Sequence, residues 1–194
     1  MRILQNVSTH CYLLESAQAN EAWGRYTFLG YDPKLEINCI DGHMKLGKLS
    51  VETENPSEYI RQILSEYKSP KFDYLPSFTG GLVGYFSYDY LGYKEKSIRG
   101  KARDTEDFKD VDLMLFDKVI AFDNLCQKII LIANMSLDAP ETGYNKAIVG
   151  LKQLRELLMH GEKKQNMGGK LLGEVTPLFE KEQYCAVSYT HLRA

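Results

Sequence analysis

The sequence has no apolar run that approaches the ~20 residues needed to span a bilayer, and residues 1–6 lack the apolar stretch of a signal peptide. Neither sign of charge dominates, because 24 lysines and arginines stand against 26 aspartates and glutamates, for a formal net charge of -2. This balance gives no electrostatic reason to expect nucleic acid or an anionic membrane as a partner. We therefore expect a cytoplasmic protein with neither of these partners.

Cysteine and histidine are scarce, with four of each. No Cys-x-x-Cys pair is present and no histidine stands at ligand spacing, so we expect no metal site, and we expect the cysteines to be buried, reduced thiols. No pair of carboxylates is placed for acid/base work and no nucleophile has a base at recognisable spacing, so no catalytic residue is predicted. The cysteines are Cys11, Cys39, Cys126 and Cys185.

Glycine is present, but not in the pattern of a phosphate-binding loop. Gly80, Gly81 and Gly84 are followed by strand-like apolar residues and not by a helix. We expect them to allow close approach within a sheet. The tyrosines from Tyr85 to Tyr93 lack clustered basic residues beside them, so a core and interface role is expected in place of a platform for stacking bases.

One short stretch carries groups suited to a small ligand. Leu14 ends an apolar pair and is followed by Glu15 and Ser16, and the chain returns through Arg25 into an aromatic segment. Glu15 can hold an ammonium group, Ser16 can donate or accept a hydrogen bond, and Arg25 can bind a carboxylate as a bidentate fork. Together they would suit an amino acid, although a solvated turn accounts for the same pattern.

Alternating apolar residues predict an antiparallel meander in the first third of the chain. Asp41-Gly42 predicts a two-residue type I′ turn, because both central residues of that turn need positive φ. A linker that contains Gln18, Asn20 and Glu21 joins the first two strands. The predicted strands are Cys11 to Leu14, Arg25 to Tyr31, Lys34 to Ile40 and His43 to Leu46.

Two helices and two long strands follow. The first helix has Asn55 as its N-cap and Pro56 at its first position, and the second runs from near Gly143 to His160. The charged segment 100–112 predicts a solvated connection, after which Val111 to Phe122 and Lys128 to Ala133 predict long central strands joined by a turn at Asp123-Asn124. The predicted stripe of the second helix is Ala147, Ile148, Leu151, Leu154, Leu157 and Leu158. The fold class that results is α+β, with mostly antiparallel, two-layer, sandwich-like sheets and flanking helices.

Two ordered motifs carry a resemblance to a known family. Residues 13–16 (LLES) with 23–33 (WGRYTFLGYDP), and then residues 76–90 (PSFTGGLVGYFSYDY), resemble the N-terminal region of anthranilate synthase component I, over about residues 3–186. In that family the LLES segment lines the feedback site for L-tryptophan, which maps onto Leu14, Glu15 and Ser16. Arg25 is the nearest match to a basic residue of that site.

The resemblance also implies a domain plan. Residues 1–160 would be the N-terminal regulatory domain without its first segment, 161–173 a linker, and 174–187 the start of a chorismate-binding domain. Residues 188–194 do not match the family and are expected to be a non-native tail. The resemblance implies an enzyme that uses Mg²⁺ to make anthranilate and pyruvate from chorismate and ammonia. A glutamine amidotransferase subunit would supply the ammonia, and L-tryptophan would inhibit the enzyme.

Within this plan the chain holds only the regulatory part, so we expect it to be non-catalytic and to bind no cofactor of its own. Two alternatives remain open. One is the equivalent region of aminodeoxychorismate synthase, and the other is a stand-alone ligand-binding or interaction module with an exposed aromatic surface.

Overall fold

The computed structural model describes residues 1–16, 24–98, 107–165 and 168–193. The chain divides into two compact units, Met1–Lys164 and Gln165–Ala194, which are described separately. The predicted linker residues Gln18, Asn20 and Glu21 lie outside the described residues, as do residues 100–106 of the charged segment 100–112.

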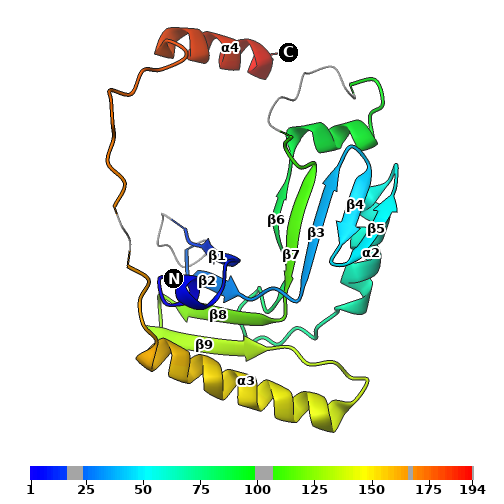
Figure 1. The fold of residues 1–194 in the computed structure, drawn as a ribbon, viewed down its shortest axis with the longest axis vertical. Helices are drawn as coiled ribbons and strands as arrows, with labels where there is room; N and C mark the ends of the chain where they lie inside the picture. The colour runs from blue at the N-terminus through cyan, green and yellow to red at the C-terminus, as the bar shows by residue number, and fades with distance from the viewer. Residues whose placement is uncertain (17–23, 99–106, 166–167, 194) are drawn as a thin grey trace. The chain divides into compact units, whose positions relative to one another are not determined.

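The first unit contains a four-stranded antiparallel sheet of order β1-β2-β8-β9. Its strands are β1 (Cys11–Leu14), β2 (Tyr26–Tyr31), β8 (Lys118–Asp123) and β9 (Lys128–Ala133). Helix α1 (Leu4–Val7) and helix α3 (Pro140–His160) cover one face, where Leu4, Ile120 and Leu154 form a buried cluster, and α3 runs along β9 (Figure 1).

A second antiparallel sheet in the same unit has five strands in the order β5-β4-β3-β7-β6. Helix α2 (Pro56–Glu66) packs Ile60 and Ile63 into the core of this sheet. The α+β class with two antiparallel sheets and flanking helices is therefore confirmed. The strands are β3 (Leu35–Ile40), β4 (His43–Leu46), β5 (Leu49–Glu52), β6 (Gly81–Phe86) and β7 (Val111–Phe116).

The prediction of one long strand from Val111 to Phe122 is wrong. The chain leaves the five-stranded sheet after β7, turns at Asp117 and enters the four-stranded sheet as β8. Both strands are largely buried, and within residues 113–122 their apolar residues are interrupted only by the charged pair Asp117-Lys118, which lies where β7 ends and β8 begins. The predicted meander is divided in the same way, because β1 and β2 belong to one sheet while β3 and β4 belong to the other.

Several local predictions are confirmed. Asp41 and Gly42 have φ values of 49° and 82° between β3 and β4, as a type I′ turn requires. Gly84 lies in β6 with φ 154°, where a Cβ would be 1.9 Å from the Asp112 carbonyl oxygen, so strand β7 passes too close for a side chain. The 3₁₀ helix η1 (Tyr88–Tyr93) follows β6.

Other local predictions need adjustment. Helix α3 begins at Pro140, three residues before the predicted start near Gly143, since proline suits the first helical turn. Asn55 precedes α2, yet its side chain binds Ser57 Oγ and Glu58 Oε1 in place of a backbone amide. Cys39 is buried and Cys11 partly so, but Cys126 and Cys185 are exposed, so the expectation of four buried thiols is wrong for these two.

The second unit contains helix α4 (Lys181–Arg193). Within the part of the chain that the structure describes, no helix combines the length and the apolar character needed to cross a membrane.

Candidate functional site

The four predicted site residues gather at one end of the four-stranded sheet. Strand β1 ends at Leu14 and is followed by Glu15 and Ser16, both exposed. Strand β2 begins at Tyr26, directly after Arg25. Because β1 and β2 pair in antiparallel register, with Leu14 opposite Phe28, the end of β1 and the start of β2 meet at the same end of the sheet.

Arg25 is already bound to a carboxylate within the protein. Its Nη2 lies 2.9 Å from Asp123 Oδ2, and its Nε lies 3.3 Å from both carboxylate oxygens. The guanidinium also lies over the Tyr26 ring, 4.9 Å from its centroid, in cation–π geometry. The side chain of Arg25 keeps 37% exposure, so part of the guanidinium faces solvent.

Asp123 is fully buried and held from several sides. Besides Arg25, its Oδ1 accepts the backbone N–H groups of Leu125 and Cys126 at 3.1 and 3.0 Å. The hydrogen bonds from Arg25, and then those from Cys126, hold the pKa of the Asp123 carboxyl well below its usual range. Sequence reasoning placed Asp123 in a turn and missed this pairing with a residue 98 positions earlier.

The sheet face beside Leu14 is aromatic. Leu14 and Phe28 are direct cross-strand partners, so their side chains share one face. The Phe28 ring lies 5.9 Å from that of Tyr26 and 5.6 Å, edge-on, from that of Phe78. Leu14 remains 46% exposed, so this end of the apolar surface is open to solvent. We call Leu14, Tyr26, Phe28 and Phe78 the aromatic face.

Tyr12 closes the inner end of the aromatic face. Its ring packs edge-on against Phe116 at 4.7 Å and Phe78 at 6.4 Å. Only 7% of the residue is exposed, and among the described residues its hydroxyl has no hydrogen-bond partner. Burial raises the pKa of the Tyr12 phenol above its usual range, because the charged form is poorly solvated there.

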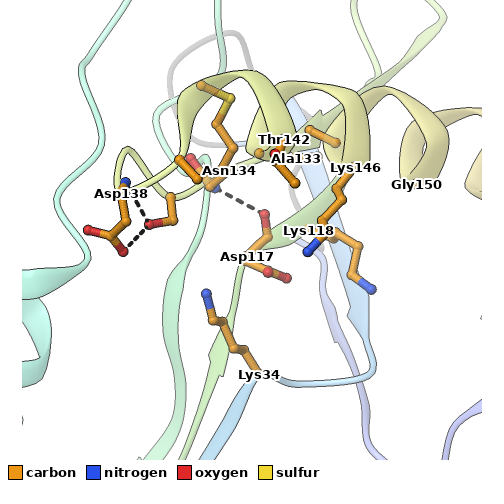
Figure 2. A pocket seen from close by; sticks show the side chains of 14 residues that line it. Lys34, Asp117, Lys118, Ala133, Asn134, Asp138, Thr142, Lys146 and Gly150 are labelled. Atoms are coloured by element: carbon orange, nitrogen blue, oxygen red, sulfur yellow. Dashed lines mark hydrogen bonds between the residues drawn. The ribbon is translucent and has the colours of Figure 1, made fainter.

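A separate polar cavity of about 450 Å³ lies where the two sheets meet. Figure 2 shows Lys34, Lys118 and Lys146 among its lining residues, with the carboxylate of Asp117 nearby. Lys118 Nζ is bound to Asp32 Oδ2 at 3.2 Å. The lining therefore carries both signs of charge, and none of the four predicted site residues belongs to it.

Asn134 joins the two sheets beside this cavity. Its side-chain amide donates to the carbonyl oxygen of Asp117 at 3.1 Å (Figure 2) and to that of Thr79 at 2.7 Å. Its Oδ1 accepts from Ser69 Oγ at 2.8 Å. A neighbouring cavity of about 590 Å³ is lined by Asn134 as well. These bonds satisfy backbone carbonyl groups at the point where β7 gives way to β8, so Asn134 has a structural role there.

No group of three or more metal-ligating side chains occurs among the described residues. The hairpin end presents one carboxylate, one hydroxyl, one guanidinium and an open apolar surface. These groups match the ammonium, carboxylate and side chain of an aromatic amino acid.

Comparison with known proteins identifies the family of the chain. The family model described as chorismate binding enzyme matches residues 9–189. The chain belongs to the chorismate-binding enzyme family. Anthranilate synthase component 1 of Pseudomonas aeruginosa is 36% identical over 155 residues, which is 76% of this chain and 31% of that protein. The yeast Saccharomyces cerevisiae protein of the same name is 34% identical over 139 residues, or 70% of this chain and 26% of that protein.

The fold agrees with this assignment. The crystal structure of anthranilate synthase component I from Streptococcus pneumoniae TIGR4 superposes with a TM-score of 0.65 at 21% identity, and covers 91% of this chain and 39% of that one. The predicted membership of the anthranilate synthase component I family is therefore confirmed. The chain spans about a third of the length of the curated relatives it matches.

Proposed function

We propose that this chain is the N-terminal, tryptophan-sensing portion of an anthranilate synthase large subunit. The observation that carries the proposal is the convergence of Glu15, Ser16 and Arg25 at one end of a sheet whose open face is aromatic. In this proposal Glu15 binds the ammonium group of L-tryptophan, Ser16 hydrogen-bonds the ligand, and Arg25 binds its carboxylate. The indole ring rests on the aromatic face.

The chemistry of the enzyme would lie elsewhere in the longer polypeptide. The relatives are about three times as long as the matched region, and in our proposal the rest of such a protein carries the Mg²⁺ and the groups that convert chorismate and ammonia into anthranilate and pyruvate. A glutamine amidotransferase subunit would supply the ammonia. Tryptophan would inhibit by binding one conformation of the whole enzyme more tightly than another.

Isothermal titration calorimetry with L-tryptophan tests the binding proposal. The 194-residue chain should show saturable heat, and Ser16→Ala should weaken the affinity by about tenfold, the loss expected for a hydrogen bond to a charged group. Ser50→Ala, at an exposed position on β5, is the matched control and should leave the affinity unchanged. Absence of heat with the unmodified chain would refute the proposed function of this chain.

The non-catalytic proposal has its own assay. The chain is mixed with chorismate, ammonium and Mg²⁺, and anthranilate is followed by its fluorescence. We expect no product above the rate without protein. Formation of anthranilate would show that the chain carries catalytic groups of its own.

A further inference from the structure

The partners of the Arg25 guanidinium are Asp123, the Cys126 sulfur at 3.8 Å from Nη2, and the Tyr26 ring over one face. Asp123 engages the Nε edge and Nη2, and within the described residues Nη1 makes no hydrogen bond. A guanidinium has five N–H donors in a fixed plane, so a carboxylate bound along the Nε edge leaves donors of Nη1 directed away from it. Arg25 can therefore hold one internal carboxylate and still present donors to a second.

The turn between β8 and β9 fixes the backbone of Arg25 as well. The backbone N–H of Asn124 donates to the Arg25 carbonyl oxygen at 2.8 Å, and its side-chain amide donates to the Gly24 carbonyl oxygen at 3.3 Å. The same amide reaches Thr27 Oγ1 at 3.3 Å. The backbone on both sides of Arg25 is thereby held by the turn that carries Asp123.

Asp123 itself is anchored independently of Arg25. Its Oδ1 accepts two backbone N–H groups of the turn, and the side chain is fully buried. A buried carboxylate with fixed partners restricts the orientation of the arginine bound to it, since the fork geometry is specific. The arginine then loses less conformational entropy when a ligand binds.

We infer that Asp123 is a positioning residue that holds Arg25 so that its free edge receives the carboxylate of an amino-acid ligand. This inference rests on the proposed function, and it assigns a role to a residue 98 positions away from Arg25 in the sequence. Asp123 does not touch the ligand. Its effect is on the recognition of the carboxylate alone, while the apolar part of the ligand is bound by the aromatic face.

The test compares two ligands that differ in one group. L-tryptophan has a carboxylate, and tryptamine has the same ring and ammonium group without it. Calorimetry on the 194-residue chain should show tryptophan bound about tenfold more tightly than tryptamine. In Asp123→Asn, tryptophan affinity should fall to near that of tryptamine while tryptamine affinity stays as it is in the unmodified chain, because the asparagine keeps an oxygen for the turn but loses the charge.

If Asp123 has a purely structural role, Asp123→Asn should lower the affinity for both ligands equally. That result would overturn the inference while leaving the proposed function intact. Arg25→Lys is a second variant, which keeps the buried aspartate. It should show the same loss of discrimination between tryptophan and tryptamine. A retained preference for tryptophan would overturn the inference. Equal affinity of the unmodified chain for both ligands would overturn it too. If the unmodified chain binds neither ligand, the proposed function fails, and the inference fails with it.

Discussion

The ring of Tyr12 lies directly over Gly30 of the neighbouring strand. A Cβ at Gly30 would be 2.1 Å from Tyr12 Cε1, and the two residues are cross-strand partners in the β1–β2 register. An aromatic ring that covers a cross-strand glycine stabilises a strand pair that would otherwise lack a side chain there. Here it also sets the inner boundary of the aromatic face.

Gly30→Ala should therefore destabilise the fold. The added methyl group must displace a ring that is packed against Phe116 and Phe78, and overpacking of this kind costs about 1–3 kcal/mol. Urea denaturation measures the loss. Gly150→Ala is the matched control, because nothing lies within 4 Å of the added atom in helix α3, and there alanine should stabilise by up to about 1 kcal/mol. Equal effects at both positions would contradict the packing described.

Tyr12→Phe should leave the protein as stable or more stable. The hydroxyl is buried without a partner among the described residues, and an unsatisfied buried polar group costs about 1–3 kcal/mol. Tyr93→Phe is the contrasting control, because its hydroxyl donates to Asp110 Oδ2 and accepts from the Gly42 N–H, both at 2.7 Å. Denaturation curves should show a loss for Tyr93→Phe only. A comparable loss for Tyr12→Phe would mean that its hydroxyl has a partner in solution.

Leu154→Ala should cost about 2–5 kcal/mol, as expected for a leucine removed from a packed core. Leu154 is 1% exposed and packs with Leu4 and Ile120 between helix α3 and the four-stranded sheet. Leu172→Ala serves as the control, since Leu172 is 99% exposed. This substitution should change the free energy of unfolding by less than about 0.5 kcal/mol. A near-neutral Leu154→Ala would show that α3 does not cover this face.

Asp123 should make stability depend on acid pH. Its pKa in the folded protein lies well below the ordinary value of 3.8, so the unfolded chain binds the proton more readily than the folded chain. The contribution is complete above the unfolded pKa and is lost as the pH falls toward the folded pKa. Melting temperatures measured from about pH 5 down to pH 2 should fall less steeply for Asp123→Asn than for the unmodified chain. Asp73→Asn, at an exposed position, should keep the original slope, and equal slopes for all three proteins would contradict this role of Asp123.

Local elements were predictable from the sequence where one short signal suffices. The Asp41-Gly42 pair identifies its hairpin because few residues adopt positive φ, and Pro56 marks the start of α2. The break at Asp117 was not predicted, because a charged pair such as Asp117-Lys118 also occurs within a continuing strand, and the pairing of β7 and β8 with different sheets depends on the tertiary fold.

The part of the site that lies within one hairpin was predictable from the sequence. Glu15, Ser16 and Arg25 lie within one hairpin, so their grouping at one end of the sheet follows from strand pairing. Asp123, Phe78 and Phe116 come from distant segments. No local pattern indicates that a turn aspartate will hold Arg25, or that rings from two sheets will meet at Tyr12, since these contacts depend on the tertiary fold.

The most direct test of the central claim is an NMR titration of the ¹⁵N-labelled 194-residue chain with L-tryptophan. The account predicts that the largest amide shifts occur at Leu14, Glu15, Ser16, Arg25 and Phe28, with small shifts around the polar cavity at Asn134 and Lys146. Largest shifts at the polar cavity, or no shifts at millimolar ligand, would contradict it.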